Sequence, residues 1–492
     1  MKSTILVGLS VIGLSALGFT TGCGDSGTTS TGTGGAGTGG TGTTTGVTVS
    51  STGGGGTGGA QGDGNDTIET ATQADVDATT GTQFYQGNLD PADSDVDFVA
   101  FDGLKGPVYI GTDAKPDTDP FADGYLDLVI TVYDSNKNQI AQNDDPFPRT
   151  SQDSSLYTVL PADGKYYVKV EEFCEFSPGC PADYFTNISE TAFAVYMVPV
   201  DTADNGNVAE ATEPNDTLAT AAPMEYEPTD TAGTYYLSVG IGDLNPTTDV
   251  DGIKFTIPSD VTVDAASRLD ASFEFPPPGK DGDGSGTNPG LIQILDGATV
   301  VASLDMSAEK NDTSRASLFA PLTANKEYLL KIGNGPASNA PSADPFYFVL
   351  HGVGSGNPVE KNEVTNDIAA TAEAVTEAAG TTSYFIEGDL GATDTGDYFS
   401  LNIEPGVLTV ACGAQRSGSG VRGLTAAVTK TDGTTVLGTA TETATTDLLI
   451  DQLDVSATGE TKVLVKMTKT SQDATVTGTY YRCGYHFAPP TN

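Results

Sequence analysis

A motif that recurs three times at a nearly fixed spacing constrains this chain more than any other feature. Each copy begins with Asn-Asp, continues through Gly-Asn-Leu or Gly-Asp-Leu, and ends with a pair of Asp residues. The last Asp stands four residues before an apolar residue in every copy. The leading residues Asn65, Asn215 and Asn366 are 150 and 151 residues apart. Matched landmarks at a fixed period indicate tandem units, and this period gives each unit the length of a domain.

Within each unit, short runs of alternating apolar and polar residues are divided by Gly, Asn and Asp turns. One example is Asp163-Gly164 followed by Lys165 to Val170. This pattern is typical of antiparallel β-sandwiches. We therefore predict an all-β chain of three tandem sandwich domains at residues 63–200, 208–354 and 359–488. Short helices are expected only directly after each Asn-Asp pair.

The N-terminal region indicates export. Residues 1–22 form a positive end and a short apolar run, which is typical of a secretory signal and too short to span a bilayer comfortably. Gly22 and Cys23 resemble the lipobox of bacterial lipoproteins, although Thr20 replaces the usual Leu. Lipidation at Cys23 is the preferred interpretation, and ordinary cleavage that leaves a free thiol is the alternative. Residues 23–62 are almost wholly Gly, Thr and Ser, so we expect a disordered tether.

The net charge of −44 separates the plausible partners from the implausible ones. So acidic a surface repels phosphate backbones, which makes nucleic acid an improbable partner. It attracts hard divalent cations, although most of the acids are better explained as a solvated coat. The chain has only two His residues, His351 and His486, which disfavours a zinc site or a His-based catalytic dyad. Both are expected to have packing or surface roles.

The repeated motif also resembles a known family. Glu213-Pro-Asn-Asp-Thr217, the later Gly-Asp-Leu and Asp-x-Asp, and Gly164 to Val170 are similar to the bacterial pre-peptidase C-terminal (PPC) domain. The resemblance implies a jelly-roll-like sandwich of about eight strands for each unit. It is weaker in the third unit, where Val364 stands at the motif's Glu position. Family members are non-catalytic modules of secreted proteins, and some bind calcium and collagen.

The resemblance implies one calcium site in each unit, since carboxylate and amide oxygens suit Ca²⁺. The candidate ligands are Asp63, Asn65, Asp66, Asp95 and Asp97 in the first unit, Glu213, Asn215, Asp216, Asp249 and Asp251 in the second, and Asn366, Asp367, Asp394 and Asp397 in the third. The alternative is local structure without metal, because Asp and Asn favour turns and Asp66 to Glu69 fits a helix capping box.

Four of the five Cys residues can pair within units. Cys174 and Cys180 enclose a short loop, whereas Cys412 and Cys483 lie in the third unit. In an oxidising compartment we expect the disulfides 174–180 and 412–483, although four Cys allow three pairings.

No catalytic motif is present in the sequence: a Gly-x-Ser-x-Gly elbow, a His-Glu-x-x-His pair and a phosphate loop are all missing. We therefore expect a non-enzymatic, lipid-anchored protein of the bacterial cell surface or outer membrane. It would touch the membrane only through its anchor and bind an extracellular or envelope protein or polysaccharide through exposed aromatic residues. The alternatives are a hydrolase with an unrecognised site and a purely structural spacer.

Overall fold

A computed structural model describes most of the chain beyond the predicted tether. It covers residues 64–488 except 79, 117–123, 145–151, 177–183, 201–206, 210, 229–232, 246–247, 276–288, 306–315, 334–345, 362–364, 376–382, 404–405 and 456–460. The predicted signal peptide, Cys23, the tether, Asp63 and Cys180 lie outside the described residues. Within the described part, no helix has the length and apolar character needed to cross a membrane.

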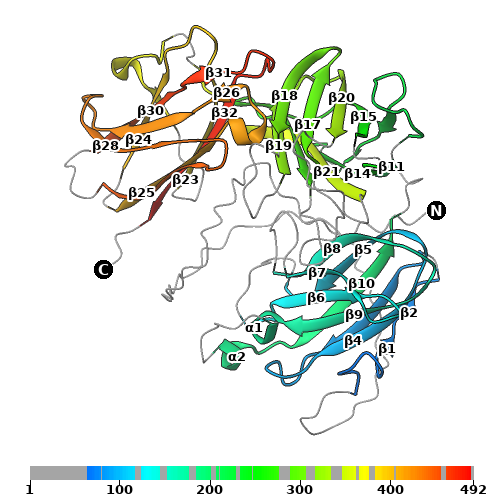
Figure 1. Cartoon of the computed structure of the whole chain (residues 1–492). Coiled ribbons are helices and arrows are strands. Elements are labelled where there is room, and N and C mark those ends of the chain that lie inside the picture. Colours follow the sequence, from blue (N-terminus) through cyan, green and yellow to red (C-terminus); the bar gives the residue numbers. More distant parts are fainter. Residues whose placement is uncertain are drawn as a thin grey trace.

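The first unit contains two five-stranded sheets (Figure 1). One has the order β1 (Thr72–Gln73), β4 (Asp97–Gly103), β9 (Gly164–Glu172), β6 (Leu128–Tyr133) and β7 (Gln139–Asn143). The other has the order β2 (Asp75–Val76), β3 (Gln83–Asn88), β10 (Ala192–Pro199), β5 (Gly106–Asp113) and β8 (Ser155–Leu160).

The second unit repeats this arrangement. Its first sheet has the order β11 (Asn207–Ala209), β14 (Tyr235–Asp243), β21 (Phe346–Pro358), β16 (Ser267–Phe275) and β19 (Ala316–Pro321), with β13 (Glu227–Pro228) paired to β14. Its second sheet has the order β12 (Ala222–Met224), β15 (Val250–Thr256), β20 (Glu327–Gly333), β17 (Leu291–Asp296) and β18 (Thr299–Asp305).

The third unit follows the same plan. One sheet has the order β22 (Glu373–Ala374), β24 (Asp397–Asn402), β30 (Lys462–Thr468), β27 (Thr425–Thr429) and β28 (Val436–Thr441). The other has the order β23 (Ser383–Asp389), β32 (Tyr480–Ala488), β25 (Val407–Gly413) and β29 (Leu448–Asp454). A small ribbon pairs β26 (Val421–Arg422) with β31 (Ser471–Gln472).

The eight principal strands of each unit are connected in one recurring order. Numbered along the chain within a unit, they form the sheets 1-8-3-6 and 2-7-4-5, first from β3 to β10, then from β14 to β21, and finally from β23 to β32 without the small ribbon. Two four-stranded sheets with these connections make a jelly roll. The predicted all-β, jelly-roll-like fold is therefore confirmed.

Burial explains why the motif ends on an apolar residue. Phe101, Phe255 and Leu401 each lie in the hydrophobic cluster between the two sheets of their unit and are at most 1% exposed. Alternation places the other core side chains. In β8, for example, Leu156, Thr158 and Leu160 are buried and their neighbours are partly exposed. The period of two in the sequence thus selects one face of each strand for the core.

The prediction of a short helix directly after each Asn-Asp pair is wrong for units one and two, and unit three has a short 3₁₀ helix there. Two of these segments are turns, closed by hydrogen bonds from Thr70 N to Thr67 O (2.9 Å) and from Thr220 N to Thr217 O (3.0 Å). The third contains only the 3₁₀ turn η1 (Ala369–Thr371), and the short helices α1 (Phe173–Phe176) and α2 (Tyr184–Asn187) lie elsewhere. Thr hydroxyls that bond locally offer the backbone an alternative to a helix.

The expected disulfide between Cys412 and Cys483 is present and joins the neighbouring strands β25 and β32. Cys174 is also disulfide-bonded, whereas Cys180 lies outside the described residues. His351 is fully buried and stacks on Phe273 with ring centroids 3.7 Å apart, so it has the predicted packing role. His486 is exposed on β32.

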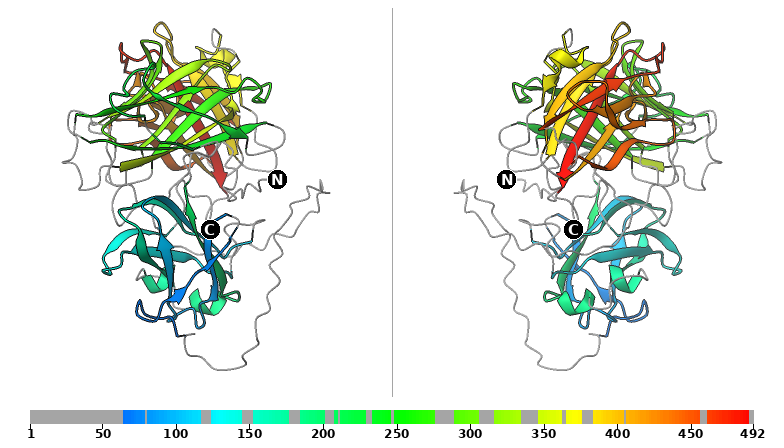
Figure 2. Two further views of the ribbon diagram at one scale, coloured as in Figure 1. Left: turned by 90° about the vertical axis from the view of Figure 1, so that its right-hand side faces the viewer. Right: turned by 90° about the vertical axis from the view of Figure 1, so that its left-hand side faces the viewer.

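Units two and three lie side by side, and unit one lies below them, on the side of unit two, in the view of Figure 1 (Figures 1 and 2). Backbone hydrogen bonds from Ser303 N to Gly418 O (2.8 Å) and from Thr477 N to Val300 O (2.9 Å) join units two and three. Tyr157 of unit one contacts Phe348 of unit two with ring centroids 5.2 Å apart. The chain therefore forms direct contacts between consecutive units.

A buried charge cluster lies at the joint between units two and three. Arg268 Nε is 3.1 Å from Glu387 Oε2 and 3.6 Å from Asp270 Oδ1. Arg482 Nε is 3.1 Å from Glu387 Oε1, and Arg268 Nη1 is 2.8 Å from Asp389 Oδ2. Asp270 and Glu387 are both fully buried. Three carboxyl groups thus face two guanidinium groups, which leaves one carboxyl group in excess.

We expect the stability of this joint to fall as the pH rises from about 4 to about 9. Burial, and then the charge of Glu387, raise the pKa of Asp270 to about 9. The folded chain therefore keeps a proton that the unfolded chain releases near pH 4, so the free energy of unfolding decreases across this range. The other charged or titratable groups around Asp270 are Arg268, Arg482, Asp389 and Tyr480.

Urea unfolding between pH 5 and pH 9 measures this slope, and Asp270→Asn, which mimics the protonated acid, should flatten it. An equal slope in wild type and variant would contradict the proton that Asp270 keeps in the folded chain.

Candidate metal centres

The leading Asn of each motif is a buried anchor. Asn65, Asn215 and Asn366 are at most 1% exposed. Asn65 O and Asn366 O accept hydrogen bonds from Phe98 N and Tyr398 N (both 2.9 Å), and Asn215 Oδ1 accepts one from Gly252 N (2.9 Å). Each donor follows the last Asp of the motif, so the Asn-Asp segment is fixed beside that Asp.

Unit two gathers three acids. A carboxylate oxygen from each of Glu213, Asp249 and Asp251 lies within 4.8 Å of the others. Asn215 connects two of them, because its Nδ2 is 3.4 Å from Asp251 Oδ1 and its backbone N donates to Glu213 Oε2 (3.1 Å). Asp251 is fully buried, whereas Glu213 is exposed. Carboxylates this close repel one another unless a proton or a cation intervenes.

Unit three gathers Asp367, Asp394 and Asp397 in the same way, again within 4.8 Å. Three buried oxygens here have no hydrogen-bond donor among the described residues: Asn366 Oδ1, Asp367 Oδ1 and Asp394 Oδ2. Asn366 also contacts Glu360, since its Nδ2 lies 3.5 Å from Glu360 Oε2. Buried oxygens are expensive to leave without a donor, and a cation is the partner that all three could share.

Unit one shows only part of this arrangement. Asn65 Nδ2 donates to the Tyr85 hydroxyl (3.0 Å), which donates to Asp97 Oδ2 (3.2 Å). Asp95 Oδ2 accepts from Asp90 N (2.7 Å). No group of three acids forms among the described residues of this unit. Asp63, one of its five predicted ligands, lies outside the described residues.

Not every predicted ligand joins a group of acids. Asp66 is exposed in unit one, and Asp216 is absent from the acid group of unit two. Glu360 is a further acid beside the site of unit three that the motif does not include, and it contacts Asn366 and Tyr481 of that unit. Its Oε1 accepts from Asp389 N (2.8 Å), and its Oε2 lies 3.5 Å from the Tyr481 hydroxyl. Glu360 stands six residues before Asn366, outside the motif spacing of unit two, so the repeat gave no signal for it.

The repeated Gly of the motif has a physical reason in two units. A Cβ atom at Gly87 would lie 2.6 Å from Asp97 Oδ2 and 2.9 Å from the Tyr85 hydroxyl. A Cβ atom at Gly388 would lie 2.3 Å from the Tyr481 hydroxyl, which donates to Asp397 Oδ2 (2.7 Å). Glycine therefore leaves room for a Tyr hydroxyl to reach the buried Asp.

A lysine supplies positive charge beside the cluster of unit three. Lys469 Nζ donates to the carbonyl oxygens of Leu390 and Gly391. Burial lowers the pKa of Lys469, against the opposing effect of Asp394 and Asp397. This ammonium group therefore offsets part of the acid charge in unit three.

A hollow of ≈ 450 Å³ in unit two bears on the hydrolase alternative. Its apolar lining includes Met224, Tyr226, Tyr236 and Phe255, and its polar lining is Glu225, Lys254, Thr256, Asp260 and Glu327. Neither Ser, Cys nor His lines it in the described part of the chain, so it offers none of the usual nucleophile–histidine pairs.

Comparisons with known proteins add little. No family model matches the chain, and no curated protein matches it. Similar solved structures include the tandem CBM51 modules of the family 98 glycoside hydrolase Sp3GH98 from Streptococcus pneumoniae, with 13% identity over 59% of this chain and 97% of that chain and a TM-score of 0.16. Tripeptidyl peptidase 2 has 10% identity over 81% of this chain and 34% of that chain, with a TM-score of 0.16. The CUB1-EGF-CUB2 domain of human MASP-1/3 has 10% identity over 55% of this chain and 99% of that chain, with a TM-score of 0.14. Likenesses at these TM-scores carry no argument about function.

Proposed function

We propose that this chain is a non-catalytic, lipid-anchored protein of the bacterial cell surface or outer membrane whose tandem β-sandwich units bind an extracellular or envelope partner. Membership of the pre-peptidase C-terminal domain family and lipidation of Cys23 belong to the same proposal. The observation that carries it is the convergence of acids at the corresponding place in two units, Glu213, Asp249 and Asp251 in one and Asp367, Asp394 and Asp397 in the other.

These residues fit a hard divalent cation. Ca²⁺ takes six to eight oxygen ligands, and it accepts carboxylate, amide and water oxygens together. In unit two the three acids would hold the ion, with Asn215 bonded to two of them. In unit three the oxygen of Asn366 that has no donor would join the acids. Bound Ca²⁺ would neutralise repelling carboxylates and fix the Asn-Asp segment to the strand that follows.

We expect Ca²⁺ to stabilise the chain against heat. A ligand that binds only the folded state adds about 2.7 kcal/mol per site at 100 times its Kd. Calorimetry with Ca²⁺ and with chelator measures this shift. Asp249→Asn should lose the part due to unit two, whereas Asp260→Asn, an exposed acid of the same unit, should behave as wild type. A melting temperature that does not change with Ca²⁺ would exclude the proposed Ca²⁺ sites.

The partner surface differs from the sequence-based expectation. Of the aromatic side chains in the described ranges, only Phe176 is exposed, so the predicted aromatic binding face is wrong for this part of the chain. Recognition would depend on polar and acidic surface instead, which suits polysaccharide hydroxyl groups or a basic protein surface.

Panels of glycans and envelope proteins test the proposed role. Saturable binding without turnover supports a binding module, whereas turnover of casein, collagen or a glycan would identify a hydrolase. A chain that shows neither binding nor turnover would be a structural spacer.

A further inference from the structure

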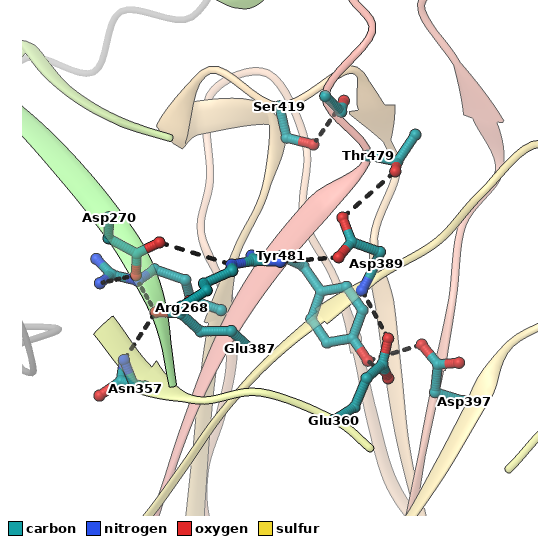
Figure 3. A network of polar contacts seen from close by, with 12 residues as sticks. Arg268, Asp270, Asn357, Glu360, Glu387, Asp389, Asp397, Ser419, Thr479 and Tyr481 are labelled. Atoms are coloured by element: carbon teal, nitrogen blue, oxygen red, sulfur yellow. Dashed lines mark hydrogen bonds and ion pairs between the residues drawn. The ribbon is translucent and has the colours of Figure 1, made fainter. Parts of the chain in front are cut away.

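The charge cluster at the joint between units two and three depends on close packing of segments from both units (Figure 3). Arg268 and Asp270 come from β16 of unit two, whereas Glu387 and Asp389 come from β23 of unit three. A Cβ atom at Gly356 would lie 1.7 Å from Asp270 Oδ2 and 3.1 Å from Glu387 Oε1. The position of β23 against unit two is therefore fixed within narrow limits.

The segment that connects the two units continues along β23. Asn357 N donates to Glu387 Oε1 (3.1 Å), and Glu360 N donates to Glu387 O (2.9 Å). Glu360 then turns its carboxylate toward the other end of β23, where Oε1 accepts from Asp389 N (2.8 Å). Glu360 thus holds the residue whose side chain pairs with Arg268 of unit two.

The same carboxylate reaches the acid cluster of unit three. Glu360 Oε2 lies 3.5 Å from the Tyr481 hydroxyl and 3.5 Å from Asn366 Nδ2. The Tyr481 hydroxyl in turn lies 2.7 Å from Asp397 Oδ2. A continuous set of polar contacts therefore leads from Asp397 through Tyr481, Glu360 and Asp389 to Arg268, as Figure 3 shows.

We infer that cation binding at Asp367, Asp394 and Asp397 and the docking of unit two on unit three are coupled through Tyr481 and Glu360. This inference rests on the proposed cation site. Tyr481 has one hydroxyl proton and two carboxylates within reach. Without a cation, the nearer Asp397 accepts the hydrogen bond from this hydroxyl. When a cation neutralises Asp397, the hydroxyl donates to Glu360 instead and fixes the carboxylate that holds Asp389.

The coupling has a defined direction. Cation binding strengthens the Asp389–Arg268 contact, so it tightens the joint. Because coupling between two equilibria is reciprocal, an intact joint must strengthen cation binding by the same factor. The element with two states is the Tyr481 hydroxyl, which donates either to Asp397 or to Glu360. The cation at one end of the path and the Asp389–Arg268 contact at the other both change the balance between these two hydrogen bonds.

The test uses the full-length chain carrying Asp249→Asn, so that Ca²⁺ titration calorimetry reports unit three. Adding Asp394→Asn should abolish the remaining heat of Ca²⁺ binding. Glu360→Gln keeps the shape of the side chain but cannot accept from both Asp389 N and Tyr481, and we expect it to weaken Ca²⁺ binding by about five-fold or more. Arg268→Gln should weaken it by a similar factor from the far side of the joint.

Hydrogen exchange provides a second readout. Ca²⁺ should slow exchange in β16 of unit two, and Glu360→Gln should remove that effect. The matched control is Tyr85→Phe, which deletes the corresponding hydroxyl–Asp contact in unit one and should leave both readouts unchanged.

The outcomes are distinguishable. If Ca²⁺ binds to unit three with equal affinity in wild type, Glu360→Gln and Arg268→Gln, and β16 exchange ignores Ca²⁺, the coupling is overturned while the cation site stands. If Asp394→Asn does not change the heat of Ca²⁺ binding, the proposed cation site of unit three is wrong, and the coupling that depends on it is wrong as well.

Discussion

Arg268→Ala is expected to destabilise the chain by about 3–5 kcal/mol, because it removes one partner of a buried ion-pair cluster. The substitution leaves Asp270, Glu387 and Asp389 facing a single remaining guanidinium group, that of Arg482. Asp270 and Glu387 are fully buried, so solvent cannot compensate for the lost charge. Urea unfolding followed by circular dichroism measures the loss, and we expect units two and three to unfold in separate transitions.

Arg416→Ala is the matched control for this prediction. Arg416 also pairs with an acid, but its partner Asp447 has a side chain that is 66% exposed. Exposed ion pairs contribute about 0–1 kcal/mol. Equal losses for Arg268→Ala and Arg416→Ala would show that the joint is solvated and that its charges do not hold the units together.

Removal of the Cys412–Cys483 disulfide is expected to cost about 4 kcal/mol, on the chain-entropy account of a loop this long. The bond closes 71 residues of unit three and ties β25 to β32. Cutting it restores freedom to the unfolded chain, while the core around both strands can remain packed. The double variant Cys412→Ala/Cys483→Ala should therefore fold with reduced stability.

Hydrogen exchange in β25 and β32 measures this effect locally. In these strands, wild-type protein treated with reductant should exchange as fast as the double variant. Reductant should not change the exchange rates of the double variant there. Exchange in β25 and β32 that is identical in oxidised and reduced wild type would contradict a stabilising role.

The repeat predicted some of the acids in the candidate sites correctly and included others that do not join them. The family resemblance implies that Asp249 and Asp251 lie with Glu213, and Asp394 and Asp397 with Asp367, and these acids do come together. Asp66 and Asp216 hold the same position after the anchoring Asn as Asp367, but only Asp367 belongs to a group of three acids. The position within the motif therefore does not by itself decide which acid joins a cluster.

Two of the residues that the motif missed share one property. Tyr481 and Lys469 are 84 and 72 positions from Asp397, and they reach its cluster from strands or turns late in the unit. A residue pattern within one segment carries no information about which distant strand will lie beside it. Only the pairing of β23 with β32 brings Tyr481 next to Gly388.

The sequence by itself determined the repeat, the β-class and the approximate strand positions, since each depends on matched landmarks or on local alternation. The tertiary structure alone decided the order of strands in the sheets, the placement of Glu360 beside the third cluster and the burial of Arg268 against Glu387. These features depend on contacts between segments that are not adjacent in the sequence, up to 119 residues apart for Arg268 and Glu387, and such contacts exist only once the sheets have formed and the units have docked.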